Sequence, residues 1–292
     1  MNIFKRVKKK LTYTEVTPLY YTAGLQKAYS GTSVTGGHLK GKHVVVTGGT
    51  GGIGFAIAKR YTAEGCHVTI TGRNKEKLEA SLKQLEMNKQ RKVDYVIMDQ
   101  LSSSSIKDAL RNILNTNEID IWVNCAGIYT DTDKSRRFRS VDKQTYTNVM
   151  GTNLKSVKLI CELLAEHWTS AQKKGQIINI ASICGLFPSY GQTPYGISKV
   201  QVANLTQQLS IKYKGNVIFH CVSPGSVATS MGNKKTGDNI SSKGSILTRH
   251  IAMPEEIAAV VAFLSSPAGM RVNNLSSFHQ PLMIKVSAGE VL

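Results

Sequence analysis

A glycine-rich segment, Thr47–Gly54, joins a short apolar run to an amphipathic stretch, and it restricts the possible folds more than any other feature of the chain. The apolar run His43–Thr47 is predicted to be a strand, and residues 52–64 are predicted to form a helix. Glycines at such a junction let backbone amides approach a pyrophosphate at the start of the helix, where the helix dipole favours an anion. The segment fits the spacing G-x-G-x-x-G, which indicates a dinucleotide-binding βαβ unit.

The alternation of strand-like and helix-like stretches continues to the end of the chain. Further strands are predicted at residues 67–71, 93–98, 119–123, 176–181, 217–222 and 282–286, with helices at 75–87, 104–114, 141–169, 193–213 and 254–264. Alternation of this kind predicts parallel strands joined by crossover helices, with ligands at the carboxyl ends of the strands. We therefore expect an α/β protein with a Rossmann-type doubly wound parallel sheet, in a single domain at 43–292 that follows an N-terminal arm and linker at 1–42.

The bulk composition argues against several classes of protein. The 292 residues suffice for one sizeable α/β domain, and no apolar stretch reaches the roughly 18 residues of a membrane span. The five cysteines form no C-x-x-C pair, so the sequence predicts neither a disulfide framework nor a metal site and favours a reducing, cytoplasmic location. The net charge of +18 suits anionic metabolites or an acidic partner, and no zinc-finger spacing or aromatic-rich basic motif indicates a nucleic-acid partner.

A candidate proton-transfer site is formed by Tyr195 and Lys199, which lie four residues apart on one face of a predicted helix, and by Ser182, thirteen positions before the tyrosine. Free tyrosine keeps its proton up to a pH of about 10. A nearby ammonium group favours the phenolate, so Lys199 is expected to make the phenol a better acid near neutral pH. A hydroxyl such as that of Ser182 could hold a substrate carbonyl beside the tyrosine.

The end of the second predicted strand bears on the choice of cofactor. An acidic residue is expected about 20 positions after the glycines when the ribose 2′-hydroxyl of a dinucleotide is bound. This chain has Arg73 there instead. A guanidinium suits a 2′-phosphate, so the sequence favours NADP(H) over NAD(H), although a solvated surface arginine would fit the same position.

These motifs occur together in the order that is typical of one family: the chain resembles a short-chain dehydrogenase/reductase. The resemblance covers residues 41–292. Within the family, the chain is similar in length and motif order to the 3-oxoacyl-carrier-protein reductase branch. The matching elements are the cofactor motif Thr47–Gly54, the N-N-A-G-like element Asn124–Gly127, Asn153 at the position of a catalytic asparagine, Ser182, the Y-x-x-x-K pair Tyr195 and Lys199, and the P-G-x-V-x-T element 224–229.

The resemblance implies a role for each candidate residue. Tyr195 would be the general acid in reduction and the base in oxidation, and Lys199 would bind the nicotinamide ribose and lower the pKa of the tyrosine. Ser182 would orient the carbonyl, and Asn153 would hold a water that connects Lys199 to bulk solvent. The implied cofactor-binding residues, besides Tyr195 and Lys199, are Gly48, Thr50, Gly51, Gly52, Ile53, Gly54, Arg73, Asn74, Asp99, Gln100, Asn124, Ala126, Gly127, Pro224, Gly225, Val227 and Thr229.

The chain departs from the family pattern at three places. Gly51 stands where many NADP-dependent members have arginine, so Arg73 alone supports the preference for NADP(H). Cys125 replaces the second asparagine of N-N-A-G and is expected to change packing without removing function. Gln280–Pro281 stands near the position where the family often has Thr-Gly, so the last strand could be entered differently.

Two further residues allow a structural or a functional interpretation. His220 lies in a predicted strand beside the cofactor loop, and a packed, hydrogen-bonded core histidine is favoured over a catalytic one. Cys184 follows Ser182 by two positions and should face the substrate, where a small lining residue is favoured over a reactive thiol.

The first 12 residues suggest a contact of their own. Ile3, Phe4, Val7 and Leu11 fall on one helical face and are surrounded by lysine and arginine, which fits an interfacial helix on an anionic membrane. An organelle transit peptide, a solvated arm and an arm that packs on a second subunit remain alternatives.

Taken together, the residues and the resemblance favour an NADP(H)-dependent oxidoreductase that interconverts a carbonyl and a secondary alcohol. The alternatives are a non-catalytic NADP(H) sensor and a membrane-attached assembly component. The small-molecule substrate could be anionic or bound to an acidic carrier, because Lys134, Arg136, Arg137 and Arg139 form a basic cluster. The family usually associates through helices corresponding to 141–169 and 193–213, which implies a homodimer or homotetramer.

Overall fold

The structure is a computed structural model and describes residues 37–86, 92–129, 141–185, 193–231, 252–267, 269 and 282–286. These residues belong to the unit Thr35–Leu292. Most of the predicted arm, the basic cluster 134–139 and Gln280–Pro281 lie outside the described residues. Within 37–42, Leu39 is buried against the domain core and the Gly41 N–H donates to the Gly65 carbonyl at 3.0 Å, so these residues pack on the domain.

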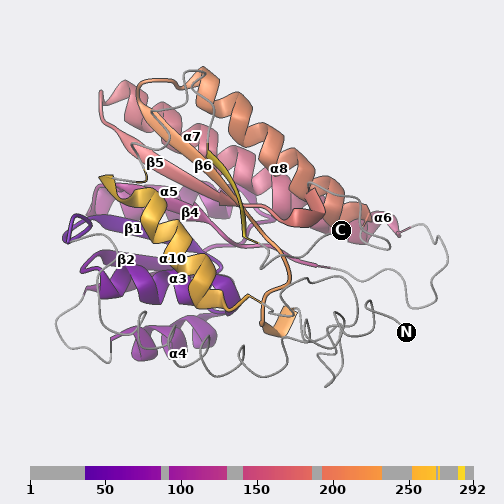
Figure 1. Ribbon diagram of the computed structural model, residues 1–292, viewed down its shortest axis with the longest axis horizontal. Helices are drawn as coiled ribbons and strands as arrows, with labels where there is room; N and C mark the ends of the chain where they lie inside the picture. The colour runs from indigo at the N-terminus through magenta and orange to yellow at the C-terminus, as the bar shows by residue number, and fades with distance from the viewer. Residues whose placement is uncertain are drawn as a thin grey trace, which may run out of the picture. The chain divides into compact units, whose positions relative to one another are not determined.

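The described strands form one parallel sheet of seven strands in the order β3-β2-β1-β4-β5-β6-β7 (Figure 1). The order reverses between β1 and β4, and a cleft therefore opens between the chains that leave the carboxyl ends of these two strands. The predicted doubly wound sheet is confirmed. The strands are β1 (His43–Thr47), β2 (His67–Gly72), β3 (Val93–Ile97), β4 (Ile121–Asn124), β5 (Gly175–Ile180), β6 (Val217–Pro224) and β7 (Leu282–Val286).

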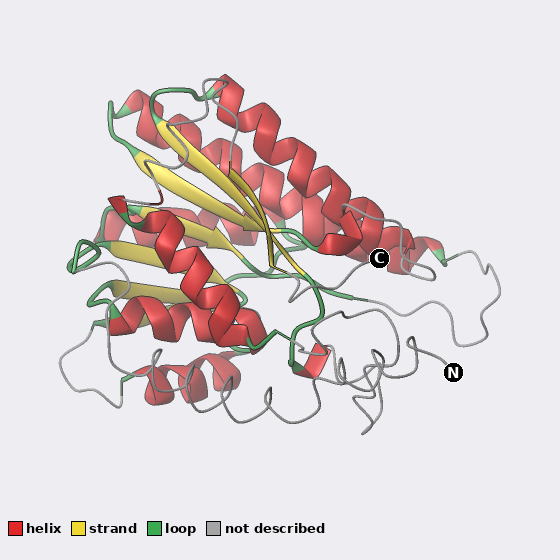
Figure 2. Cartoon of the chain, viewed as in Figure 1, coloured by secondary structure: helices red, strands yellow, loops and turns green. Residues whose placement is uncertain are grey.

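Helices cover both faces of the sheet (Figure 2). Strand β1 shows why, because Val44 and Val46 join one buried apolar cluster while Val45, pointing the other way, joins a second. The first cluster includes side chains of α3 (Gly52–Ala63), α4 (Lys75–Leu85) and α10 (Pro254–Ser265). The second includes side chains of α5 (Ser103–Thr116), α7 (Ser156–Ser170) and α8 (Thr193–Lys212).

The predicted helix at 141–169 is wrong in one respect, because the structure divides it into three segments. These are α6 (Lys143–Met150), the π-helical turn η1 (Gly151–Lys155) and α7. A π-turn inside a helix often marks a functional position, and this one contains Asn153. None of the helices in the described ranges is long and apolar enough to cross a membrane.

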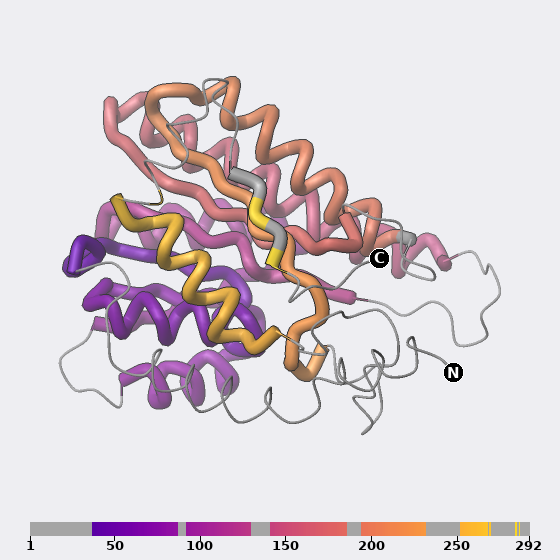
Figure 3. Tube along the Cα trace, viewed as in Figure 1, coloured from indigo at the N-terminus to yellow at the C-terminus, as the bar shows by residue number. Residues whose placement is uncertain are grey.

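The last strand closes the far edge of the sheet. In Figure 3 the yellow trace of β7 lies beside the orange trace of β6, and the two strands pair from His220–Leu282 to Pro224–Val286. The Gly225 N–H then donates to the Val286 carbonyl at 2.7 Å. The pairing therefore fixes the position at which the chain leaves β6.

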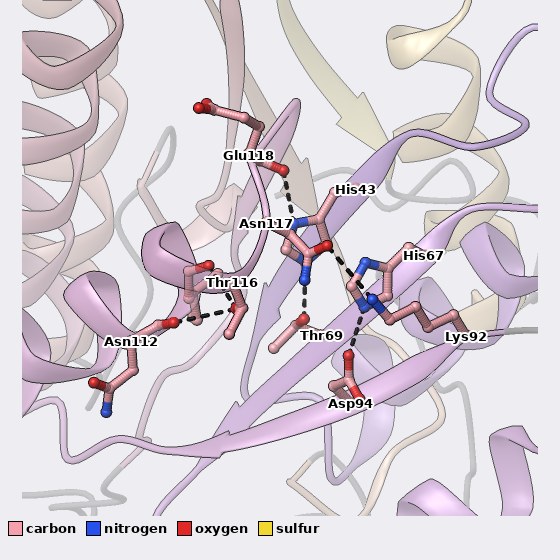
Figure 4. Close-up of polar contacts among 10 residues, drawn as sticks. His43, His67, Thr69, Lys92, Asp94, Asn112, Thr116, Asn117 and Glu118 are labelled. Atoms are coloured by element: carbon pink, nitrogen blue, oxygen red, sulfur yellow. Dashed lines mark hydrogen bonds and ion pairs between the residues drawn. The ribbon is translucent and has the colours of Figure 1, made fainter.

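A polar cluster ties together the amino ends of the strands, at the opposite edge from the cleft (Figure 4). The rings of His43 and His67 stack with centroids 4.2 Å apart, and His67 Nε2 lies 2.6 Å from an Asp94 carboxylate oxygen. The Glu118 carbonyl must accept a hydrogen bond from His43 Nδ1, at 2.8 Å, so Nε2 of the neutral ring accepts from the Thr69 hydroxyl. Burial lowers the pKa of His43 to about 4, which keeps the ring neutral.

Candidate active site

A cavity of about 510 Å³ lies at the carboxyl edge of the sheet, at the point where the strand order reverses. Loops that follow β1, β2, β3, β4, β5 and β6 all contribute to it. The predicted site residues that line it are Gly48, Thr50, Gly51, Gly52, Ile53, Gly54, Arg73, Asp99, Gln100, Ala126, Gly127, Ser182, Tyr195, Lys199, Pro224, Gly225, Val227 and Thr229. The structure thus brings together segments that are far apart in the sequence.

The glycine-rich turn after β1 is built for close backbone approach. Gly48 has a φ of 68°, a conformation that favours glycine, and a Cβ there would lie 2.9 Å from the Ala126 Cα. A Cβ on Gly54 would collide with the Gly48 carbonyl, so the turn can pack on the first turn of α3 only with glycine at position 54. Gly51 differs, because a Cβ there would meet nothing within 4 Å. No side chain caps the start of α3, so the first backbone N–H groups of this helix remain available to a ligand in the cavity.

The end of β4 is held against the end of β1. The Thr47 hydroxyl accepts hydrogen bonds from the N–H groups of Cys125 and Ala126, at 3.0 and 2.9 Å. Cys125 lines the cavity, and burial raises the pKa of its thiol to about 12. The Asn124 side chain instead turns into the core, where it donates to Asn179 Oδ1 at 2.8 Å and accepts from the Trp122 indole at 2.8 Å. Asn124 therefore stabilises the core next to the cleft and leaves its side chain out of the cavity.

The side of the cavity next to β2 and β3 carries charged and amide groups. Arg73 follows β2, is exposed and lines the cavity. Asp99 follows β3, lines the cavity and accepts from the Leu101 N–H at 3.0 Å. Asn74 instead caps α4, because its side chain accepts a hydrogen bond from the Lys77 N–H at 2.7 Å.

Helix α8 and the end of β5 bring the candidate catalytic side chains together. Tyr195 and Lys199 both reach the cavity from the first turns of α8, as their spacing predicts, and Ser182 follows β5. The Lys199 ammonium donates to the Ile180 carbonyl at 2.8 Å and lies 5.7 Å from the centroid of the Tyr195 ring. The Ser182 hydroxyl accepts from the Cys184 N–H at 3.2 Å and is hydrogen-bonded to the tyrosine.

The pKa of Tyr195 is raised, whereas the sequence predicts that Lys199 lowers it. Burial raises the pKa of Tyr195 to about 12, and the hydrogen bond with Ser182 lowers it only in part. Burial also lowers the pKa of Lys199. The expectation of a more acidic phenol presumed a close lysine–tyrosine contact, whereas Lys199 is bound to a carbonyl of β5. In the structure Tyr195 is therefore a protonated, neutral phenol at neutral pH.

Asn153 acts as a clamp from the π-turn. Its Oδ1 accepts from the Ile128 N–H at 2.8 Å, and its Nδ2 donates to the Ile128 carbonyl at 2.9 Å and to the Ser198 hydroxyl at 3.1 Å. Ser198 in turn donates to the Tyr195 carbonyl at 2.7 Å. One fully buried amide therefore connects the loop after β4 to the first turn of α8.

Asn74, Asn124 and Asn153 are the predicted site residues that do not line the cavity in the described part of the chain. Sequence reasoning also overlooked several lining residues, although most directly adjoin a recognised motif. These are Thr71, Gly72, Met98, Ile128, Tyr129, Thr152, Ile180, Ala181, Ile183, Ser226, Ser230 and Met231. Adjacency to a motif was the available signal for Ile128, Tyr129 and Ile183.

The two ambiguous residues are placed as follows. Cys184 lines the cavity, as predicted. His220 is fully buried, also as predicted, but the expected hydrogen bond is wrong, because neither ring nitrogen has a partner in the described structure. Among the residues that the structure describes, no group of three or more histidine, cysteine, aspartate or glutamate side chains could hold a metal ion.

Comparison with known proteins identifies the family. The sequence profile of the short chain dehydrogenase family matches residues 42–240. The chain is 35% identical over 235 residues to the 3-oxoacyl-(acyl-carrier-protein) reductase FabG of Chlamydia trachomatis, a match that covers 79% of this chain and 92% of that protein. It is 29% identical to 3beta-hydroxysteroid dehydrogenase 1 of Eggerthella lenta, over 82% of this chain and 92% of that protein. A solved short chain dehydrogenase/reductase family protein superposes with a TM-score of 0.73 at 28% identity, over 86% of this chain and 97% of that one. The chain belongs to the short chain dehydrogenase family and is an oxidoreductase of the FabG-like branch.

Proposed function

We propose that the protein interconverts a carbonyl and a secondary alcohol with NADP(H), and that Tyr195 transfers the proton. The observation that carries this proposal is one continuous cavity that runs from the glycine-rich turn to Tyr195, Ser182 and Lys199. Such a cavity can hold an extended dinucleotide at one end and a carbonyl beside a proton donor at the other.

The residues fit a dinucleotide cofactor. At Gly48 and Gly54 the backbone packs too closely to admit a Cβ, which holds the turn against α3, and the uncapped start of α3 suits a pyrophosphate. Gly127 lies beside Lys199, since a Cβ on it would be 3.6 Å from the ammonium nitrogen, so Lys199 is placed to hold a ribose hydroxyl. A bound nicotinamide cofactor would supply the hydride.

Arg73 supports the choice of NADP(H). Arg73 follows β2 and lines the cavity. In the strand order of the sheet it lies on the other side from Tyr195, where a 2′-phosphate would be placed. Gly51 itself supplies no side chain, and a Cβ there would meet nothing within 4 Å, so Arg73 would carry the discrimination from NAD(H) without help from that position.

The protonated state of Tyr195 suits proton donation in the reductive direction. The raised pKa keeps the phenol protonated, and a protonated phenol beside the Ser182 hydroxyl is ready to donate to a carbonyl oxygen that gains negative charge. Ser182 would orient that oxygen, and Lys199 would stabilise the phenolate left behind. Asn153 fixes the loop after β4 relative to the start of α8. We also propose that it would hold a water for Lys199.

The substrate and the assembly are proposed more broadly. The relatives named above are reductases or dehydrogenases of carbonyl or hydroxyl groups by their names, and we propose a small carbonyl or alcohol substrate, anionic or carrier-bound. We further propose a homodimer or homotetramer, because α8 exposes Val200 and Ile211 and α6 exposes Tyr146. The division into an arm at 1–42 and a domain at 43–292, a cytoplasmic location, and a peripheral membrane contact through residues 1–12 stay proposals of the same kind.

The experiment is a carbonyl reduction assay with purified protein. A panel of ketones and 3-oxoacyl thioesters is offered with NADPH and, separately, with NADH, and loss of reduced-cofactor absorbance is followed. We expect turnover with NADPH and much weaker turnover with NADH. Tight NADPH binding without turnover of any carbonyl would favour the non-catalytic sensor instead.

A further inference from the structure

The cavity contains an aromatic pair whose second member has no role so far. Tyr129 lies five residues after the end of β4 and lines the cavity. Its ring meets the ring of Tyr195 edge-on, with centroids 5.1 Å apart and an angle of 75° between the planes. Edge-to-face pairs at this separation are attractive, so each ring restricts the orientation of the other.

The backbone on both sides of this pair is held by the same amide. Asn153 binds the N–H and the carbonyl of Ile128, directly before Tyr129, and it also binds Ser198, which donates to the Tyr195 carbonyl. The relative position of the two rings is therefore set by a buried hydrogen-bond network as well as by their own contact. Such support is typical of side chains whose geometry matters for chemistry.

Several cavity-lining residues that adjoin Tyr129 or Ser182 in the sequence are apolar. Ile128, Ile183 and Cys184 line the cavity next to Tyr129 or Ser182 in the sequence. The charged lining residues that the structure describes are Arg73, Asp99 and Lys199, and the first two follow β2 and β3, on the far side of β1 from β4 and β5. On the β4–β5 side the charged lining group is Lys199, which already donates to the Ile180 carbonyl.

We propose that Tyr129 is the positioning and specificity-determining residue of this site: its ring holds Tyr195 in orientation and forms the wall that receives an apolar substituent of the substrate carbonyl. This inference rests on the proposed carbonyl reduction. It selects a ketone with an apolar group next to the carbonyl over one with hydroxyl groups there, because hydroxyls placed against an aromatic ring lose hydrogen bonds to water and gain none.

The test compares two substitutions at one position with two ketones. Tyr129→Phe keeps the ring and Tyr129→Leu removes it, while Tyr95→Leu, at a half-buried tyrosine on β3 away from the cavity, controls for general loss of packing. The ketones are an aryl-alkyl ketone, acetophenone, and a hydroxylated one, dihydroxyacetone. For each variant, kcat and KM are measured separately with NADPH, together with the NADPH dissociation constant.

We expect Tyr129→Phe to stay within about twofold of the unmutated protein for both ketones. Tyr129→Leu should lose kcat by about three- to tenfold with both, the scale of one aromatic pair, and raise KM for the aryl ketone alone. NADPH binding should not change in any variant.

Three results overturn the inference: equal KM for the aryl ketone in the Leu and Phe variants, the same change of KM for both ketones, or an equal loss in Tyr95→Leu. Failure of the unmutated protein to reduce any carbonyl of the wider panel is a different result. It rejects the proposed function, and the inference falls with it.

Discussion

His220 makes the stability of this protein sensitive to acid. The ring lies in β6 with no exposed surface, and neither nitrogen has a hydrogen-bond partner in the described structure. Burial lowers the pKa of His220 from the usual 6.5 to about 4. The folded protein therefore resists protonation at this ring, whereas the unfolded chain accepts the proton readily.

The size of the effect follows from the two pKa values. Because the folded pKa is the lower one, the free energy of unfolding is at its full value above pH 6.5. It decreases as the pH falls toward 4. The loss from this one ring should be about 2 kcal/mol at pH 5 and about 3 kcal/mol once the pH is below 4. His43, with a pKa of about 4, adds a similar loss that the substitution below leaves unchanged.

The perturbation is His220→Leu, which replaces the buried ring with an apolar side chain that has no titrating group. Urea unfolding at pH 7.5 and at pH 5 gives the change in the free energy of unfolding for each protein. In the variant that change should be smaller by about 2 kcal/mol than in the unmutated protein. His38→Leu, at an exposed histidine, should leave it unaltered. Equal pH dependence in His220→Leu and the unmutated protein would refute the reasoning.

Three further predictions concern the cofactor, the assembly and the arm. Arg73→Ala should weaken NADPH binding by about 1.5–3 kcal/mol, the scale of a charged hydrogen bond, and leave NADH almost unchanged; equal affinities for the two cofactors in the unmutated protein would contradict this. Light scattering should find a dimer or tetramer at tens of micromolar, and Ile211→Glu, at an exposed residue of α8, should weaken it; a monomer throughout would count against the proposal. Removal of residues 1–12 should abolish salt-sensitive binding to anionic vesicles and spare turnover, and binding that survives truncation or high salt would reject the membrane contact.

The strands could be predicted because each is short, apolar and followed by a clear turn. His43–Thr47 has the predicted bounds, since its side chains are buried on both faces of the parallel sheet and include a run of three valines. Leu282–Val286 also has the predicted bounds. The π-turn could not be predicted in this way. It places Asn153 where its amide meets Ile128 and Ser198, partners that lie 25 and 45 residues away in the chain.

The candidate site could be predicted as a set of backbone positions but not as a set of side-chain directions. The motifs gave the loops that meet at the cavity, and most of the predicted residues line it. Asn124 follows the same strand as Ala126, yet its side chain points into the core toward Asn179. Tyr129 was overlooked because it lies just past a recognised motif, and only the folded chain brings its ring against Tyr195.

The central claim is that the phenol of Tyr195 supplies the proton in carbonyl reduction, and Tyr195→Phe tests it most directly. The substitution keeps the ring that contacts Tyr129 and removes the hydroxyl group alone. Steady-state kcat with NADPH and the best ketone of the panel should fall by at least about a hundredfold, the scale of general acid–base catalysis, while the NADPH dissociation constant stays nearly the same. A variant that turns over at a near-normal rate would contradict the account.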